Sequence, residues 1–268
     1  MINLGKKNIL GVLVDAVDYE AAASRIIEAA ACGMSLSVSA LAVHGVMTGV
    51  LDPMQRYRLN HLDIVTPDGQ PVRWALNGLY KTGLKDRVYG PNLVMLVCQQ
   101  AMENGYPVYL YGSRPEVLAS LCTHLQTRFP GLSIAGVQPS LFRTITQVEK
   151  MEMVCKIKES GARMVFVGLG CPRQEVWIYE NASALAMPLI AVGAAFDFHA
   201  SLIKEAPGWM QSIGLEWLFR LFMEPRRLWK RYLLLNPLYL VLLFLQKIGL
   251  HRFDPGTAEK PEIELRYG

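Results

Sequence analysis

The chain has 268 residues, of which 51% are hydrophobic and 19% charged, enough apolar material for a large folded domain and too much for a disordered or collagen-like chain. Its net charge of +4 is too small to predict a nucleic-acid-binding protein, because a surface that tracks phosphates usually needs a dense basic face. The five cysteines are widely spaced and form no C-x-x-C pair, so they favour neither a disulfide framework nor a zinc site and fit a reducing cytoplasm.

The first 22 residues contain a short apolar run that Asp15 and Asp18 interrupt. This run lacks the apolar core and the small-residue cleavage site of a secretory signal. We therefore expect no export by a signal peptide.

Helical patterns and short apolar runs alternate over most of the chain. Helices are expected, from apolar spacing and Pro or Gly stop signals, at 18–31, 92–105, 115–131 and 146–161. Short apolar runs that end near glycine lie at 107–113, 163–170 and 188–195. Runs buried on both faces are typical of parallel strands. The order predicts an α/β fold, a Rossmann-like and mostly parallel sheet flanked by helices, with its ligand at the carboxyl edge.

Composition divides the chain into three parts. Residues 1–208 form the expected α/β catalytic domain, and residues 209–252 lose the strand signal and are expected to form a basic and apolar helical appendage. Residues 253–268 are polar, and we expect this tail to be loosely held.

The segment 61–75 places Asp68 and Gly69 directly after a short strand-like run and a proline. The commonest use of Pro-Asp-Gly is a turn, so these residues by themselves do not indicate chemistry. Taken in isolation, the turn is the favoured interpretation of this segment.

The segment 167–175, VGLGCPRQE, begins as G-x-G, but Arg173 stands where a dinucleotide-binding fingerprint needs a small residue. The glycines allow backbone N–H groups to approach a phosphate-bearing ligand at a helix N-terminus. A plain strand-to-helix turn explains them equally well. A P-loop, H-E-x-x-H, G-x-S-x-G and an internal D-x-D are all missing from the sequence, so side-chain cations and helix dipoles are expected to neutralise any bound diphosphate.

The segment 214–232 is the most basic part of the chain, with five cations against two anions. The cations are Arg220, Arg226, Arg227, Lys230 and Arg231. On a continuous helix Arg220, Arg227 and Arg231 would share one face, whereas a new helix that starts at Pro225 would change this alignment. Guanidinium groups suit a lipid diphosphate or anionic headgroups, and the alternative is a solvated charged face.

The run 233–246 follows directly and is almost wholly apolar, which raises the mean hydropathy of the chain to +0.21. About 20 apolar residues are needed to span a membrane, and Asn236 and Pro237 are expected to break this run. Attachment to a membrane surface is the favoured interpretation because charges flank the run. A buried core helix is the alternative.

Several blocks, taken in order over residues 8–240, resemble the WecG/TagA/CpsF family, glycosyltransferase family 26. They are the Asp-Gly pair at 68–69, RVYGPNL at 87–93, YLYGS at 109–113, FVGLGCPRQEVWI at 166–178, AVGAAFDF at 191–198, APGWMQSIGLEWLFRL at 206–221 and EPRRLWKRY at 224–232. Such an ordered set is far more specific than any one block.

The resemblance implies an inverting glycosyltransferase that needs neither a metal nor another cofactor and moves a sugar from a UDP-sugar to a polyprenyl-diphosphate-linked sugar. It implies work at the cytoplasmic face of the plasma membrane in the biosynthesis of bacterial surface polysaccharides, with a homo-oligomer as a possible state. The family's base falls on Asp68 and the glutamine of its active pocket on Gln174. The arginines that the family is thought to use to bind the diphosphate and to seat the enzyme on the membrane fall within residues 220–231. Expected substrate-binding residues, from these blocks, the glycine loops and the segment at 39–44, are Ser39, His44, Gly69, Arg87, Gly90, Asn92, Gly112, Gly168, Gly170, Pro172, Gln174, Glu175, Gly193, Phe196 and Asp197.

The chain departs from the family pattern at its first strand, where Leu41 replaces an asparagine. Either His44 takes over a polar contact or the donor sugar differs from N-acetylmannosamine. Lys204 and Glu205 likewise stand where an arginine often precedes the Ala-Pro pair.

Two other classes of protein share part of this pattern. A nucleotide-dependent oxidoreductase or sugar-modifying enzyme would use the same sheet, and a non-enzymatic membrane-assembly partner would explain the basic, apolar segment. Neither accounts for the ordered blocks.

Overall fold

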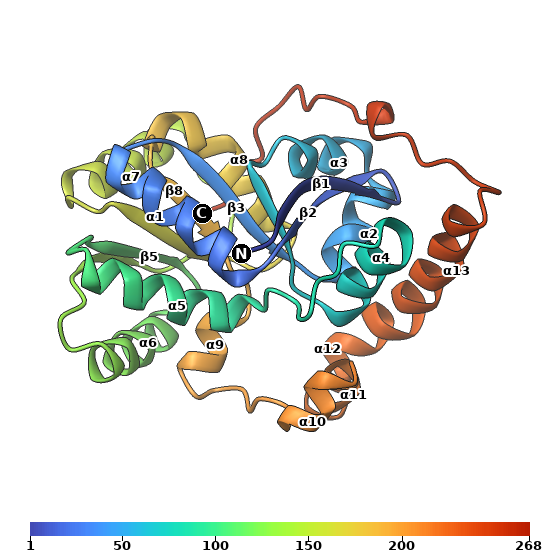
Figure 1. Ribbon diagram of the computed structural model, residues 1–268. Coiled ribbons are helices and arrows are strands. Elements are labelled where there is room, and N and C mark those ends of the chain that lie inside the picture. Colours follow the sequence, from blue (N-terminus) through green and yellow to red (C-terminus); the bar gives the residue numbers. More distant parts are fainter.

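A parallel six-stranded sheet, with strands in the order β4-β3-β8-β7-β5-β6, forms the centre of the computed structural model (Figure 1). The structure describes the backbone of residues 1–268 and every side chain except those of Arg227 and Arg231. The strands of this sheet are β3 (Leu36–Leu41), β4 (Ile64–Pro67), β5 (Val108–Gly112), β6 (Ile134–Gln138), β7 (Met164–Gly168) and β8 (Pro188–Ala191). The predicted α/β fold with a mostly parallel sheet is confirmed.

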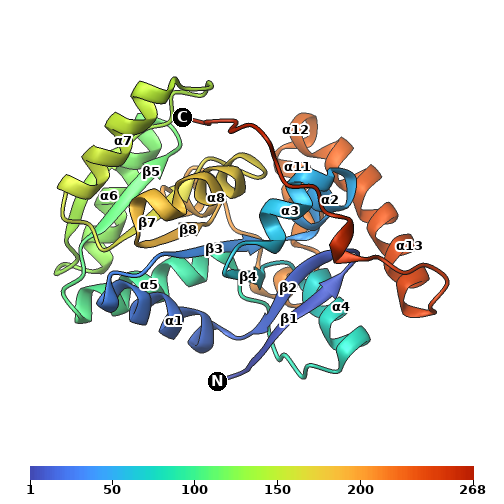
Figure 2. The same ribbon diagram turned by 90° about the horizontal axis from the view of Figure 1, so that it is seen from above.

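Helices cover both faces of the sheet, with α1 and α5 on one side and α2, α3 and α8 on the other (Figure 2). The helices of this part are α1 (Tyr19–Cys32), α2 (Val43–Leu51), α3 (Pro53–Asn60), α4 (Gln70–Tyr80), α5 (Gly90–Glu103), α6 (Pro115–Arg128), α7 (Gln147–Glu159), α8 (Arg173–Leu185) and α9 (Ala195–His199). Two separate apolar clusters fill the spaces between the sheet and its two helical layers. The four helices expected from the sequence are confirmed, because their stop signals act locally: the Asp18 side chain caps α1 and Gly33 ends it in the left-handed conformation.

An antiparallel hairpin of β1 (Asn3–Ile9) and β2 (Val12–Val17) precedes the parallel sheet and was not predicted. Leu10 and Gly11 turn it, both with positive φ. Asp15, which interrupts the apolar run, is buried, and its carboxylate accepts the N–H of Val65 on edge strand β4 at 2.8 Å. The polar residue therefore satisfies a backbone donor at the edge of the sheet.

The C-terminal helices leave the α/β domain as an extension along one side of the molecule (Figure 1). They are α10 (Gly208–Ser212), α11 (Glu216–Met223), α12 (Pro225–Lys230), a π-helical turn (Arg231–Leu235) and α13 (Asn236–Lys247). The expectation that Asn236 and Pro237 break the apolar run is wrong. A proline removes one backbone donor from a helix, and its ring crowds the turn that precedes it. Here the preceding turn is a π turn, which is wider than an α-helical turn. The helix therefore continues through Pro237.

One helical segment, Leu228–Lys247, is long and apolar enough by length and composition to cross a membrane. Only 18% of it is buried, so it is not the core helix of the alternative interpretation. Leu228, Tyr232 and Tyr239 are buried residues of this segment, and the Tyr239 hydroxyl donates to the carbonyl of Pro71 on α4 at 3.3 Å.

Residues 253–268, which we call the C-terminal strap, return from α13 across the α/β domain (Figure 2). The expectation that this tail is loosely held is wrong. Asn8 donates to the carbonyl of Phe253 at 2.6 Å, and Glu259 donates its N–H to the carbonyl of Pro53 at 3.1 Å. Polar composition concealed these contacts because they involve mainly the backbone of the strap.

Candidate active site

A cavity of about 550 Å³, which we call the large cavity, opens over the carboxyl ends of β3, β7 and β8. In parallel α/β sheets this edge is the usual ligand site, because loops and helix N-termini converge there. Gly168, Gly170 and Gly193 line it, at two of the three glycine-ended runs that the sequence singled out. The position predicted for the ligand, at the carboxyl edge of the sheet, therefore coincides with the large cavity.

Asp68 follows β4 and lies at the wall of the large cavity. Its Oδ1 accepts the N–H of Gly90 at 2.7 Å. Burial raises the pKa of the Asp68 carboxyl to about 6, although the Arg87 charge and the Gly90 N–H act in the opposite direction. A carboxylate with a pKa near neutrality can accept a proton from a substrate hydroxyl and still be ionised at physiological pH.

A second cavity of about 100 Å³, which we call the small cavity, lies on the side of Asp68 that faces the C-terminal helices. Asp68, Tyr89 and Arg220 line both cavities. Trp217 and Tyr232, from the C-terminal helices, line only the small one. Asp68 therefore stands at the junction between the edge of the sheet and the appendage.

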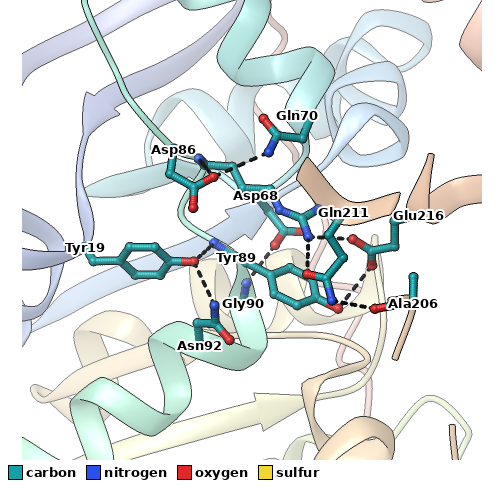
Figure 3. Close-up of polar contacts among 11 residues, drawn as sticks. Tyr19, Asp68, Gln70, Asp86, Tyr89, Gly90, Asn92, Ala206, Gln211 and Glu216 are labelled. Carbon is teal, nitrogen blue, oxygen red and sulfur yellow. Dashed lines mark hydrogen bonds and ion pairs between the residues drawn. The ribbon is translucent and has the colours of Figure 1, made fainter. Parts of the chain in front are cut away.

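A buried ion pair joins the α/β domain to α11 beside Asp68 (Figure 3). Arg87 Nη2 lies 2.5 Å from Glu216 Oε2 and also donates to Gln211 at 3.2 Å. The Tyr89 hydroxyl donates to the other carboxylate oxygen of Glu216 at 3.1 Å, and the Arg87 guanidinium stacks over the Tyr89 ring at 4.1 Å. Glu216 thus binds Arg87 and Tyr89, and the next residue, Gly90, donates its N–H to Asp68.

Tyr19 on α1 supports the same segment from the other side (Figure 3). Its hydroxyl accepts the N–H of Tyr89 at 2.8 Å and a weaker bond from Asn92 at 3.4 Å. The Asp86 carboxylate accepts the N–H of Arg87 at 2.8 Å. Side chains from α1, α10 and α11 therefore hold residues 86–92, and this keeps Gly90 in contact with Asp68.

Two acceptors without hydrogen-bond partners line the floor of the large cavity. Gln174 Nε2 and Ser39 Oγ donate to Glu175 Oε1 at 2.9 and 3.0 Å. Gln174 Oε1 and Glu175 Oε2 are buried and have no partner. Burial raises the pKa of Glu175. Unpartnered buried acceptors are costly, so this floor suits a ligand that brings hydroxyl donors.

The glycines at the strand ends have different physical roles. Gly112 has φ +101°, and a Cβ there would lie 2.9 Å from the backbone of Gly168, so this position serves close packing of two strand ends. Gly193 has φ +56° and faces the side chain of Gln174. A Cβ at Gly168 would lie 2.4 Å from the Phe196 ring.

Substitution of Gly168 by alanine is expected to lower the free energy of unfolding by about 1–3 kcal/mol, because the ring of Phe196 must move to admit a methyl group. Denaturant unfolding of the two proteins measures this change. Gly78→Ala is the matched control, since a Cβ at Gly78 meets no atom within 4 Å and its φ is not positive. A Gly168→Ala protein as stable as the control would contradict the close contact.

The structure places the expected site residues in three groups. Those that line the large cavity are Asp68, Gly168, Gly170, Gln174, Glu175, Gly193 and Asp197. Those that line the small cavity are Asp68, His44, Gly69 and Arg87. The others, Ser39, Gly90, Asn92, Gly112, Pro172 and Phe196, line neither cavity and lie behind or beside these walls.

Among the three cations of the basic stretch whose side chains the structure describes, Arg220 differs from Arg226 and Lys230 in its surroundings. Arg220 lines both cavities, stacks 5.3 Å above the ring of Phe198 and has a buried Nε without a hydrogen-bond partner. Arg226 and Lys230 are exposed. The side chains of Arg227 and Arg231 lie outside the described residues.

Sequence reasoning missed Tyr89, Glu216 and Phe142 as site residues. Tyr89 stands inside a matching block, and Glu216 was counted only as one of two anions in a basic stretch. A buried carboxylate in a stretch rich in arginines is expected to pair with a cation. This expectation would have identified Glu216 as a site residue. Phe142 carries no such signal because it lies in a loop.

Leu41 and His44 lie on different cavities. Leu41 lines the large cavity, and its side chain fills the space beside Gly45, where a Cβ would lie 2.2 Å from Leu41 Cδ1. His44 lines the small cavity. The histidine is therefore not placed to replace the family's asparagine in the large cavity.

A buried carboxylate of raised pKa, beside arginines in a cavity at the carboxyl edge of a parallel sheet, is typical of an enzyme active site. The sequence model described as "Glycosyl transferase WecG/TagA/CpsF family" matches residues 7–253. The chain belongs to this family. It is a glycosyltransferase, and the family implies a role in the biosynthesis of cell-surface polysaccharides.

Proposed function

We propose that the protein is an inverting, metal-independent glycosyltransferase that moves a sugar from a UDP-sugar donor to a polyprenyl-diphosphate-linked sugar at the cytoplasmic face of the plasma membrane. The observation that carries the proposal is the place of Asp68 between two cavities, one over the edge of the sheet and one against the appendage. The donor occupies the large cavity, and the acceptor reaches Asp68 through the small one. Family membership supports a nucleotide-sugar donor and a lipid-linked acceptor.

The proposed reaction is a single displacement. The ionised Asp68 removes the proton from the acceptor hydroxyl while that oxygen forms a bond to the anomeric carbon. The bond between the anomeric carbon and the β-phosphate oxygen breaks at the same time, and UDP leaves with the electron pair. Attack from the face opposite the leaving group inverts the anomeric configuration.

The departing diphosphate needs positive charge. Arg220 supplies a guanidinium at the junction of the two cavities, where its Nη2 also lies 3.9 Å from Glu224 Oε2, and guanidinium groups bind phosphate oxygens. Gly170 and Cys171 line the large cavity just before α8, where helix N–H groups favour an anion. These groups of the chain itself are proposed to stabilise the departing UDP.

The transferred sugar is proposed to lie on the floor of the large cavity. Gln174 and Glu175 line this floor and offer amide and carboxylate groups to its hydroxyls. Leu41 presents an apolar surface where the family pattern has an amide. We therefore expect the donor sugar to differ from N-acetylmannosamine at the position that faces Leu41.

A panel of UDP-sugars, assayed with a synthetic lipid-diphosphate-linked sugar, tests the function and identifies the donor. Inversion is read from the anomeric configuration of the product. Addition of EDTA to the same assay tests the metal independence. Failure to bind or use every UDP-sugar would contradict the proposal, and tight binding of NAD(P) would support the oxidoreductase alternative.

The exposed apolar side chains of the C-terminal helices are proposed to bind the membrane surface. They include Phe222, Trp229, Leu233, Leu234, Leu240, Val241 and Phe244. Arginines and lysines beside such a surface favour anionic lipid headgroups.

Replacement of both Leu240 and Phe244 by glutamate is expected to reduce binding to vesicles that contain anionic lipid by at least about a hundredfold, because each buried side chain contributes about 1.5–3 kcal/mol. Sedimentation with the vesicles measures it. The matched control replaces Met151 and Val148, which are exposed on α7, by glutamate. Equal binding of the two double variants would contradict the proposed surface.

A further inference from the structure

The end of the C-terminal strap contacts α7 and α8. Glu264 of the strap pairs with Lys150, near the start of α7, at 2.7 Å. Further along, the Glu180 carboxylate on α8 accepts the N–H groups of Leu265 and Arg266 at 2.7 and 2.9 Å. At the start of α8 the guanidinium of Arg173 lies 5.6 Å above the ring of Tyr267. Because α8 begins at the carboxyl edge, the strap ends beside the large cavity.

The last residues of the strap pair with the loop 139–145. Ile145 donates its N–H to the carbonyl of Arg266 at 2.9 Å, and Gly268 donates to the carbonyl of Arg143 at 3.0 Å. The hydroxyl of Ser140, which is buried, donates to the carbonyl of Gly268 at 2.6 Å. A Cβ at Gly268 would lie 2.2 Å from Ile145 Cγ2, so this contact is also closely packed.

The same loop contributes Phe142 to the lining of the large cavity. Phe142 has φ +54°, a conformation that is unfavourable for a bulky residue unless its surroundings hold it. The Phe142 N–H donates to Ser140 Oγ at 2.9 Å, and the Ser140 N–H donates to the carbonyl of Ser113 at 3.0 Å. Ser140 therefore connects the strained aromatic residue to the strap on one side and to the end of β5 on the other.

Phe142 has the chemistry of a stacking platform. Its side chain is 56% exposed although it lines a cavity, which leaves a ring face available to a ligand. Ser113 and Arg114 line the same part of the cavity and offer polar contacts at its rim. A planar heterocycle stacks on an aromatic ring and takes hydrogen bonds at its edge, so this end of the large cavity fits a nucleobase.

We infer that residues 264–268 are a positioning element for donor binding: they hold the loop 139–145 so that Phe142 forms the platform for the nucleobase of the nucleotide-sugar donor. The nucleobase assignment rests on the proposed function. The mechanical link between the strap and the loop rests only on the contacts above.

Three variants of the full protein test the inference. The first lacks residues 264–268, the second is Gly268→Ala, which keeps the strap but crowds Ile145, and the third is Phe142→Ala. Glu262→Gln is the control because Glu262 is an exposed residue of the strap outside its paired end. Hydrogen exchange of the loop 139–145 is measured without ligand, UDP binding by calorimetry, and kcat and both KM values in the transferase assay.

Loss of residues 264–268 is expected to speed amide exchange at Phe142 and Ile145 by more than about tenfold, because the hydrogen bonds that close the loop are lost. It is also expected to weaken UDP binding and raise the donor KM by about tenfold, with kcat and the acceptor KM changed less than about twofold. Gly268→Ala shows the same pattern to a smaller degree. Phe142→Ala raises the donor KM similarly, and the truncation adds little to it, since both act through one contact.

Unchanged exchange in the loop after truncation would overturn the inference. So would faster exchange with unchanged UDP binding, because the loop would then not serve the nucleobase. If the unmodified protein neither binds UDP nor turns over a UDP-sugar, the proposed function and the nucleobase assignment fail together. The exchange measurement still decides the link between strap and loop in that case.

Discussion

Replacement of Asp68 by asparagine is expected to lower kcat by about a hundred- to ten-thousand-fold, because the amide cannot accept the proton of the acceptor hydroxyl. Asparagine keeps the side-chain oxygen that accepts the Gly90 N–H, so the geometry of the site is preserved. Single-turnover rates with saturating donor and acceptor measure the loss. A folded Asp68→Asn enzyme with near-normal turnover would exclude Asp68 as the base.

The pH profile gives a second measurement on the same residue. Because the pKa of Asp68 is raised to about 6, kcat/KM of the unmodified enzyme is expected to fall tenfold per pH unit below that value, as the carboxylate becomes protonated. The Asp68→Asn enzyme is expected to lack this limb. An acid limb that persists in the variant would assign the titration to another group.

Stability changes in the opposite direction from activity. The folded pKa of Asp68 lies above its ordinary value of 3.8, so the folded protein binds this proton more tightly, and the ionised carboxylate destabilises the fold as the pH rises from about 4 to about 6. At neutral pH Asp68→Asn removes that penalty. Its midpoint of thermal unfolding is expected to rise by a few degrees, which shows that the loss of activity is not loss of the fold.

Replacement of Glu216 by alanine is expected to lower the free energy of unfolding by about 3–5 kcal/mol, because it leaves Arg87 buried without its partner. The two side chains are only 8% and 11% exposed, so water does not replace the lost contact. Denaturant unfolding measures the change. Glu116→Ala, which breaks the exposed pair with Arg114, is the control and is expected to change stability by less than about 1 kcal/mol.

The same substitution is expected to move the acid limb of the pH profile below about 6. The negative charge of Glu216 raises the pKa of Asp68, and the positive charge of Arg87 lowers it, so removal of Glu216 leaves Arg87 unopposed. Glu216→Gln is expected to have a smaller effect on stability, since the amide oxygen still accepts a hydrogen bond. An acid limb unchanged by Glu216→Ala would contradict electrostatic coupling between α11 and Asp68.

The appendage and the α/β domain are thus connected at the candidate site. Glu216 belongs to α11, yet its partners Arg87 and Tyr89 lie beside Asp68. A change in the position of the C-terminal helices would therefore alter the surroundings of the carboxylate that is proposed to start the reaction. Such a change would alter the small cavity, because residues of the α/β domain and of the C-terminal helices line it.

Local patterns predicted local structure well. The helices α1, α5, α6 and α7 were predicted because their caps and stop residues act within one or two turns. The buried strands β5, β7 and β8 were predicted because both of their faces are apolar. Strand β6 was not predicted, since it is an edge strand of mixed burial.

Errors arose where a residue is satisfied by a distant partner. Asp15 looked like an interruption but binds Val65 of β4, and Pro237 looked like a break but follows a π turn. The strap looked free because its polar residues have no apolar face, whereas its backbone pairs with the loop 139–145. The errors at Asp15 and at the strap have the same origin, since a hydrogen bond across more than 20 residues leaves no periodicity in the sequence, whereas the error at Pro237 concerns the local geometry of a helix.

The sequence by itself determined the α/β class, the carboxyl-edge site, the family and the candidate residues Asp68 and Gln174, because these depend on local patterns and on ordered blocks. Only the tertiary structure decided that Asp68 lies between two cavities, that Glu216 rather than solvent neutralises Arg87, and that the strap reaches the rim of the large cavity. The physical reason is that the pKa of a side chain and the contacts it makes depend on its burial and on its partners. Burial and partners are supplied by elements that lie far apart in the chain.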